Sequence, residues 1–399
     1  MAAQTRPQDA RSTQVSAKKA LCVATVERRT KAQSGVVFGF LGMLLEFKCE
    51  SFPINQTKNE SMTHSITSSL RRTALALGLS ALSLAGLAQD NNSIVVYNAQ
   101  HVSLTQAWAN GFTQETGIKV ILRNGSDTEL GNQIVQEGAA SPADVFLTEN
   151  SPSMALVDTN GLLAPVAADT ITQVAANYRP EHGRWVGIAA RSTVFVYDRR
   201  KLSAAQMPHS LLDLAKPEWK GRWAASPAGA DFQAIVSALL ELKGEAATLQ
   251  WLKAMKENAI PYKGNGVAMK AVNAGQVDGA VIYHYYRFGD QAKTGENSKY
   301  TALHYFRNQD PGAFVSISGG GVLASSKHPT QAQAFLKWIT GKGGQDILRT
   351  GNSYEYAVGV GAASNPALVP LAELQSPKVD PSKLNSKRVS DLMTQAGLL

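Results

Sequence analysis

Two adjacent tyrosines, Tyr285 and Tyr286, end the run Tyr283-His284-Tyr285-Tyr286, which closes a stretch predicted to be a strand over residues 277–283. In open α/β sheets, ligands bind beyond the carboxyl ends of strands, so these rings are expected to face a cleft. Phenolate oxygens suit hard metal cations, which prefer oxygen to sulfur. Taken alone, the run favours a plainer interpretation, in which the rings lie at a strand edge with their hydroxyls in water.

Two further donor side chains occupy comparable positions in the chain. His101 follows a predicted strand over residues 93–98, and Glu149 follows another over residues 143–148. Either one alone would be interpreted as a surface or capping residue. Four donor-bearing residues that all follow strand ends are expected to converge, and this favours a ligand site.

Signatures of catalysis are absent from the sequence. It contains no G-x-S-x-G elbow and no H-E-x-x-H motif, and residues 89–399 contain no cysteine. The run Gly341-Lys342-Gly343-Gly344 lacks the spacing of a phosphate-binding loop and is interpreted as a helix-terminating turn. A metal-dependent enzyme would need a general base beside an open coordination position, and no candidate base is found. The chain is therefore predicted not to be an enzyme.

The elements that must position these donors alternate between short β runs and helical segments, as in α/β units on largely parallel sheets. Strands are predicted over residues 93–98, 118–122, 143–148, 184–190, 193–197, 223–225, 277–283 and 314–323. Helices are predicted around residues 104–112 and over 126–138, 231–242, 244–258, 267–274 and 330–340. Element count and length predict two lobes with more than one crossover: residues 89–190 with about 318–365, and about 191–317 with 366–399.

The charge distribution argues against a nucleic-acid partner. The chain has a formal net charge of +8, but residues 1–88 carry 11 Lys and Arg against 5 Asp and Glu. Residues 89–399 therefore carry 28 basic against 26 acidic residues, so the folded part is nearly neutral. Both cysteines, Cys22 and Cys49, also lie before residue 89, and a cysteine-free body suits an oxidising compartment.

Residues 62–88 have the pattern of a cleavable secretory signal. Arg71 and Arg72 precede an apolar run over residues 74–87 that is short for a membrane span, and a small-x-small site ends at Ala88. Met62 is interpreted as the true start, and residues 1–61 as a non-native or unstructured extension. The competing interpretation is a genuine extension with a short membrane-associated segment at residues 35–45. Either way, residues 89–399 are expected in the periplasm.

The runs VVYNAQH, SPADVFLTEN and RSTVFVYDRRKL, together with the tyrosine pair and NGVAMKAVNAGQVDGAVI, resemble the ferric-ion-binding periplasmic proteins of bacterial iron ABC transporters. The resemblance extends through almost the whole chain from residue 93. It implies the hinged two-lobed fold of periplasmic binding proteins. It also implies capture of ferric iron between the lobes and delivery by a monomer to an inner-membrane permease.

The resemblance implies a ligand set of His101, Glu149, Tyr285 and Tyr286. Two phenolates and one carboxylate would balance the charge of Fe³⁺ and leave about two coordination positions open. A synergistic anion, phosphate or carbonate-like, is implied at those positions. The residues that match the family's anion cradle are Ala228, Gly229, Ala230 and Asn265.

The sequence departs from the family pattern at two positions. Ala228 stands where the family commonly has a hydroxyl residue, which removes one donor to the anion. Tyr283 stands where the family has an asparagine. Strand alternation would place Tyr283 on the same face as Tyr285, so it is either a further contact or a replacement ligand. Arg191, near the predicted crossover, is interpreted either as an anion contact or as part of a structural ion pair.

A binding protein of the same fold for another solute, such as a polyamine, a phosphonate or an oxyanion, is the alternative prediction. A polyamine site needs several carboxylates between aromatic walls, whereas an anion site needs neutral donors or arginine. The tyrosine pair with His101 and Glu149 favours ferric iron over both.

Overall fold

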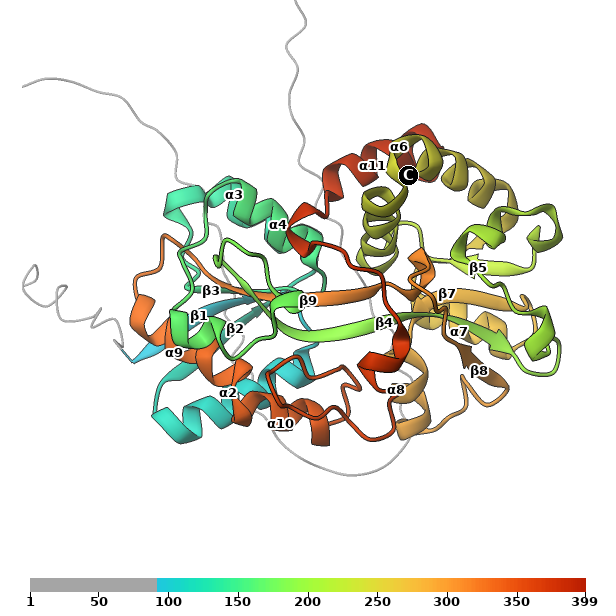
Figure 1. The fold of residues 1–399 in the computed structure, drawn as a ribbon. Coiled ribbons are helices and arrows are strands. Elements are labelled where there is room, and N and C mark those ends of the chain that lie inside the picture. Colours follow the sequence, from blue (N-terminus) through green and yellow to red (C-terminus); the bar gives the residue numbers. More distant parts are fainter. Residues whose placement is uncertain (1–91) are drawn as a thin grey trace, which may run out of the picture. The chain divides into compact units, whose positions relative to one another are not determined.

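The structure is a computed structural model and describes residues 92–399 (Figure 1). Its strands are β1 (Ser93–Asn98), β2 (Lys119–Asn124), β3 (Val145–Leu147), β4 (Val186–Asp198), β5 (Trp223–Ala225), β6 (Ala259–Pro261), β7 (Gly279–Tyr283), β8 (Thr301–His304) and β9 (Val315–Val322). Its α-helices are α2 (Val102–Thr116), α3 (Asp127–Glu137), α4 (Ser151–Thr159), α5 (Ala168–Ile171), α6 (Ala230–Asn258), α7 (Asn265–Asn273), α8 (Tyr285–Lys293), α9 (Pro329–Thr340), α10 (Lys342–Thr350) and α11 (Ser386–Gln395).

Hydrogen bonds join the strands in the order β2-β1-β3-β9-β4-β7-β5-β6, and β8 pairs with β4. β1 is parallel to β2 and β3, and β5 is parallel to β6 and β7. The long strands β4 and β9 are antiparallel to each other and to their other neighbours. The predicted α/β class is confirmed, but the sheet is mixed rather than largely parallel.

Strands β4 and β9 lie side by side through the middle of the fold and join its two halves (Figure 1). The pairing of β4 changes partway along: Ser192 pairs with Val315 of β9, whereas Thr193 pairs with Tyr283 of β7. The predicted strands 184–190 and 193–197 are therefore one continuous strand. Arg191 and Ser192 lie inside this strand and are buried, although a charged residue is unusual at a buried strand position.

Two separate cores lie on the two sides of this junction. The first gathers side chains from β1, β3, α2, α4, α9 and the first part of β4, including Trp108 and Phe335. The second gathers side chains from α6, β7, α11 and the loops before β5, including Trp251. A smaller cluster on α7 and the adjoining strands adds to the second half. We call the halves around these cores the first and second lobes; the predicted residue boundaries of the lobes stay a prediction.

Local signals explain where several helices begin and end. Leu104, Trp108 and Phe112 are all buried, as the apolar spacing predicted, and Gly117 ends α2 with φ 74°. Ser126 and Glu129 form the predicted capping box at the start of α3. These features need only neighbouring residues, so the sequence was a sufficient guide to them.

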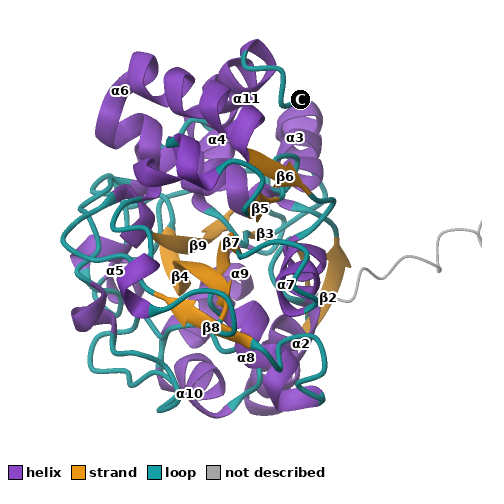
Figure 2. Cartoon of the chain, turned by 90° about the vertical axis from the view of Figure 1, so that its right-hand side faces the viewer, coloured by secondary structure: helices purple, strands orange, loops and turns teal. Residues whose placement is uncertain are grey.

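Helix α6 consists of two helical segments that meet at a kink, as the sequence predicted. The segments 231–242 and 244–258 were predicted as two helices, and in the structure they are separated by the non-helical backbone of Gly244, where φ is 77° and ψ is 173°. In Figure 2, α6 lies beside α11 above the strands of the second lobe. Side chains from both segments of α6 and from α11 belong to the same hydrophobic core.

Predictions on the signal sequence, on Met62, on the extension and on both cysteines fall outside the described residues. Within residues 92–399, no helix is long and apolar enough to cross a membrane.

Gly279, the first residue of β7, provides a test of how that strand is held. A Cβ at this position would lie 2.1 Å from Cζ of Phe195, a fully buried ring on β4. We predict that Gly279→Ala lowers the free energy of unfolding by about 1–3 kcal/mol, because the ring has no room to yield. Denaturant unfolding measures the change. Gly289→Ala in α8, where nothing lies within 4 Å, is the control and should be neutral or slightly stabilising.

Candidate metal-binding site

The candidate residues all follow the carboxyl ends of strands. His101 follows β1, and Glu149 follows β3 in the first lobe. In the second lobe, Tyr285 and Tyr286 follow β7, while residues 228–231 follow β5 and Asn265 follows β6. Strand ends from both lobes therefore supply side chains to one place, as the general rule for α/β sheets requires.

Three of the four predicted metal ligands are in direct contact. His101 Nε2 lies 3.1 Å from Glu149 Oε1, and the Tyr285 hydroxyl lies 2.7 Å from the same oxygen. The rings of His101 and Tyr285 meet edge to face, with centroids 4.7 Å apart. The contacts between Tyr285 and the other two cross from the second lobe to the first.

Tyr286 joins the group through a carboxylate that the sequence analysis missed. The rings of Tyr285 and Tyr286 stack with centroids 4.4 Å apart. The Tyr286 hydroxyl donates to Asp231 Oδ2 at 2.9 Å, and the Tyr285 hydroxyl lies 3.2 Å from the same oxygen. Asp231 is only 5% exposed. A second carboxylate thus lies directly at both phenol oxygens.

Asp231 stands in the first turn of α6, directly after the segment predicted to hold an anion. Asn265 donates from Nδ2 to Asp231 Oδ2 at 2.8 Å, so this predicted anion contact binds a protein carboxylate here. The Gly229 amide donates to the carbonyl of Ser226 at 3.0 Å, and its part in holding an anion stays a prediction. An acidic residue in a first helical turn is ordinarily explained by the helix dipole. The sequence therefore did not single out Asp231 as a candidate site residue.

Ala228 and Ala230 flank Gly229 in the segment predicted to hold an anion. Ala228 is exposed in the turn after β5, and Ala230 is the first residue of α6, with Gly229 as N-cap. Neither brings a side-chain donor, so their part in holding an anion stays a prediction.

The argument that placed Tyr283 beside Tyr285 by strand alternation was wrong. β7 ends at Tyr283 and α8 begins at Tyr285, so the two residues do not belong to one strand. Tyr283 is fully buried and its hydroxyl donates to Asn150 Oδ1 at 3.2 Å. Its ring centroid lies 6.3 Å from that of Tyr285, but its hydroxyl is used in a different contact.

Arg191 forms a structural ion pair, one of the two predicted roles. Its Nη2 lies 2.7 Å from Glu355 Oε2 and 2.7 Å from Ser318 Oγ, and both charged side chains are fully buried. Glu355 also binds His101, since Oε1 lies 2.8 Å from His101 Nδ1. No sequence pattern pointed to Glu355, because it lies in a loop more than 250 positions from His101.

This contact has a chemical consequence for His101. A histidine that binds a metal through one ring nitrogen commonly donates its other N–H to a carboxylate, which fixes the ring and raises its basicity. Here Nδ1 is directed to Glu355, while Nε2 faces Glu149 among the phenol and carboxylate oxygens. The ring is therefore oriented to offer Nε2 to a ligand in the site.

Buried carboxylates help to raise the pKa values of four side chains in the site. Burial lowers the pKa of His101, but the carboxylates of Glu355 and Glu149 outweigh burial and raise this pKa to about 10. Burial and the charge of Glu149 raise the pKa of Asp231 to about 6. Burial and the charge of Asp231 also raise the pKa values of Tyr285 and Tyr286 well above the ordinary tyrosine value. His101, Tyr285 and Tyr286 thus hold protons that a bound cation would displace.

A metal at this site would need the tyrosine oxygens among its ligands. Within residues 92–399, no group of three or more His, Cys, Asp or Glu side chains is arranged to hold a metal. With the phenols included, one imidazole nitrogen and four oxygens from Glu149, Asp231, Tyr285 and Tyr286 meet. This donor set is rich in anionic oxygen and contains no sulfur, which fits a hard trivalent cation.

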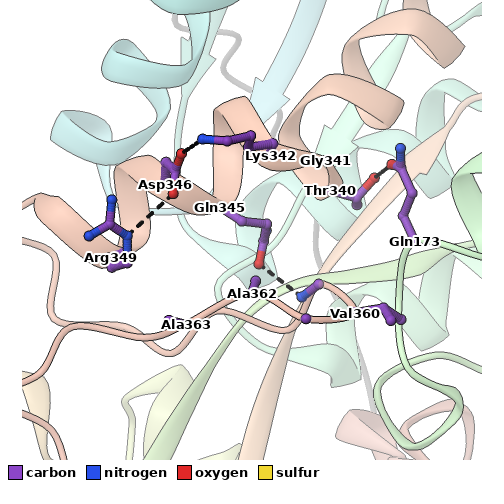
Figure 3. A pocket seen from close by; sticks show the side chains of 12 residues that line it. Gln173, Thr340, Gly341, Lys342, Gln345, Asp346, Arg349, Val360, Ala362 and Ala363 are labelled. Atoms are coloured by element: carbon purple, nitrogen blue, oxygen red, sulfur yellow. Dashed lines mark hydrogen bonds and ion pairs between the residues drawn. The ribbon is translucent and has the colours of Figure 1, made fainter.

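The pocket drawn in Figure 3 is a separate feature of the first lobe. Its volume is about 460 Å³, and α10 and the loop around Val360 line it. Lys342 pairs there with Asp346, and Gln345 accepts from the amide of Val358. None of the candidate metal ligands lines this pocket.

Fold and site together define a periplasmic-type binding protein, and comparison with known proteins agrees. The chain belongs to the family of bacterial extracellular solute-binding proteins, whose profile matches residues 140–383. The matched range includes site residues from both lobes, such as Glu149 and Tyr285, so the site lies within the solute-binding fold.

Individual relatives have more specific descriptions than the family as a whole. An Fe(3+)-binding periplasmic protein of Serratia marcescens is 73% identical over 312 residues, which are 78% of this chain and 92% of the relative. The major ferric iron-binding protein of Neisseria meningitidis serogroup B is 38% identical over 82% of this chain and 99% of its own length. The crystal structure of iron-bound HitA from Pseudomonas aeruginosa aligns with a TM-score of 0.73 and 40% identity, covering 77% of this chain and 99% of HitA.

The buried pair of Arg191 and Glu355 yields a stability test. We predict that Glu355→Leu lowers the free energy of unfolding by about 3–5 kcal/mol, because it leaves Arg191 buried without its counter-charge. The double variant Arg191→Met with Glu355→Leu should recover part of that loss, since the guanidinium is removed together with its direct partner. Denaturant unfolding of the metal-free protein measures both. A double variant as unstable as the sum of the two single variants would contradict the assignment.

Proposed function

We propose that this protein is the periplasmic substrate-binding component of an ABC transporter that captures ferric iron and delivers it to an inner-membrane permease. One observation carries the proposal: the phenol oxygens of Tyr285 and Tyr286 meet the carboxylates of Glu149 and Asp231 beside His101. The names of the relatives in Serratia and Neisseria support iron as the solute.

The ligand set proposed for the iron is His101, Glu149, Tyr285 and Tyr286, with Asp231 as a fifth donor. Asp231 lies against both phenol oxygens and Asn265, where the family resemblance predicted a phosphate or carbonate-like anion. Five donors from the chain leave about one octahedral position, which a water molecule can fill. We therefore propose that no synergistic anion is required.

Capture is reversible binding without a chemical step. Each lobe holds part of the donor set, so only the closed arrangement completes the coordination and iron favours closure. Opening of the lobes at the permease then exposes the iron. A monomer fits this cycle, because one chain contains every proposed ligand.

Export to the periplasm is part of the proposal. The pattern over residues 62–88 and the periplasmic location in the name of the Serratia relative support it. A mature N-terminus near Gln89, found by intact-mass measurement of exported protein, would test cleavage.

Binding of another solute on this fold is the competing function, and ferric loading discriminates between them. We predict that adding ferric citrate to purified protein produces a visible phenolate-to-iron charge-transfer colour. Tyr285→Phe with Tyr286→Phe should abolish that colour, whereas Tyr300→Phe, away from the site, should retain it. A wild-type protein that stays colourless would refute the assignment and reopen a polyamine, phosphonate or oxyanion ligand.

Asp231 can be tested separately from the tyrosines. We predict that wild-type protein binds ferric iron with the same affinity in buffer with and without phosphate and carbonate. Asp231→Asn should weaken ferric binding by more than the roughly 10–100-fold cost of losing an outer-shell partner. Chelator competition measures both effects. An absolute need for an added anion in the wild type would show that Asp231 does not take its place.

Proton release provides a third test. His101, Tyr285 and Tyr286 hold protons at neutral pH, because the pKa of His101 is raised to about 10 and those of the tyrosines stand higher than normal. Iron needs the deprotonated forms, so binding should release about three protons below about pH 10 and affinity should rise with pH. Above about pH 10 His101 has already lost its proton, so the rise should become shallower, with only the two tyrosine protons released. Titration in weakly buffered solution with a pH electrode counts the protons. A release near zero would contradict phenolate ligation.

A further inference from the structure

The side chain of Asn150 makes four hydrogen bonds, although it contributes no ligand atom to the proposed iron site. Its Nδ2 donates to Asp127 Oδ2 at 3.0 Å and to Asp231 Oδ1 at 2.9 Å. Its Oδ1 accepts from the hydroxyls of Tyr283 at 3.2 Å and Ser316 at 3.0 Å. An asparagine amide has two N–H donors and two acceptor sites, so this buried side chain is fully used.

These four partners come from different parts of the fold. Asn150 is the N-cap of α4, and Asp127 begins α3, both in the first lobe. Asp231 begins α6, and Tyr283 ends β7, both in the second lobe. Ser316 lies on β9, one of the two strands that join the lobes. A single amide thus ties the two lobes together beside the site.

Asp127 fixes Asn150 to the first lobe. Its two carboxylate oxygens accept from the backbone amides of Glu149 and Asn150, at 2.8 and 3.0 Å, as well as from the Asn150 side chain. The proposed ligand Glu149 and the bridging residue Asn150 are therefore held by one buried carboxylate. Movement of the first lobe must carry both residues together.

The contact with Asn150 also decides which way Asp231 faces. Asn150 occupies Asp231 Oδ1, and this directs Oδ2 to Tyr285, Tyr286 and Asn265. Asn265 belongs to the second lobe and can hold Asp231 whether the lobes are closed or open. The hydrogen bond from Asn150 crosses from one lobe to the other, so parting of the lobes would break it.

We propose that Asn150 is an interlobe positioning residue that couples closure of the lobes to the placement of the Asp231 carboxylate, with Tyr283 holding the amide in register. The inference rests on the proposed function and deepens it, because it assigns control of iron release to residues that do not bind iron. It also gives Tyr283 a role other than that of a ligand.

Iron release measures this coupling. We predict that Asn150→Ala speeds the loss of ferric iron to an excess of chelator by roughly 10–100-fold, the effect of losing hydrogen bonds to a charged group. Tyr283→Phe removes one bond to the amide and should give a smaller increase, roughly 2–10-fold. The charge-transfer band should shift in Asn150→Ala, where Asp231 is released, and keep its position in Tyr283→Phe.

Asn258→Ala is the matched control. Asn258 is also a buried asparagine, and its side chain donates to the carbonyls of Leu214 and Lys216, all within the second lobe. Its loss should destabilise the protein in thermal unfolding and leave the iron release rate and the band unchanged. Asn150→Ala should do the reverse: the iron-loaded variant should release iron faster than wild type, while the metal-free variant should lose less melting temperature than Asn258→Ala does.

The outcomes separate this inference from the proposed function. If wild-type protein fails to bind ferric iron, the function itself is refuted. If wild-type protein binds iron while Asn150→Ala releases it at the wild-type rate, the function stands and the positioning role is overturned. If Asn150→Ala does not fold, a wild-type release rate in Tyr283→Phe would likewise overturn the role.

Discussion

The guanidinium of Arg191 is buried where β4 passes from one lobe to the other, and it is the counter-charge for the carboxylates around it. It pairs with Glu355 at 2.7 Å, and its charge helps to lower the pKa of Glu149 against the opposing effect of burial. Burial of acidic side chains is costly unless a cation is close. Without this cation, the acidic groups of the site would be expected to take up protons or move toward solvent.

The position of Arg191 also links the site to the lobe junction. Glu355 connects the guanidinium to His101, so the ring that offers Nε2 to the site is tied to the central strand. The same strand pairs with β9 up to Ser192, the residue after Arg191, and with β7 from Thr193 onward. The charge arrangement and the mechanical connection between the lobes are thus built on the same few residues.

A carboxylate of the chain stands where the resemblance predicted a bound anion. Asp231 belongs to the second lobe, as do both tyrosines, and its two oxygens point in different directions. One oxygen faces the phenols, and the other accepts from Asn150 of the first lobe. Unlike an anion from solution, this carboxylate is part of the second lobe and stays with it. In the proposed role, its orientation depends on the contact with Asn150.

The sequence by itself determined the α/β class, most strand positions, half of the ten α-helices of residues 92–399, and the convergence of His101, Glu149 and Tyr285. Strand ends and helix caps depend on neighbouring residues, which the sequence shows directly. It did not decide that β4 is continuous or where Tyr283 points, since the change from strand to helix at residue 284 overrides alternation. Only the tertiary structure brought in Asp231, Glu355 and Asn150. Most of their partners lie more than 50 positions away, and no local pattern of residues indicates a buried charge balance or a hydrogen bond across two lobes.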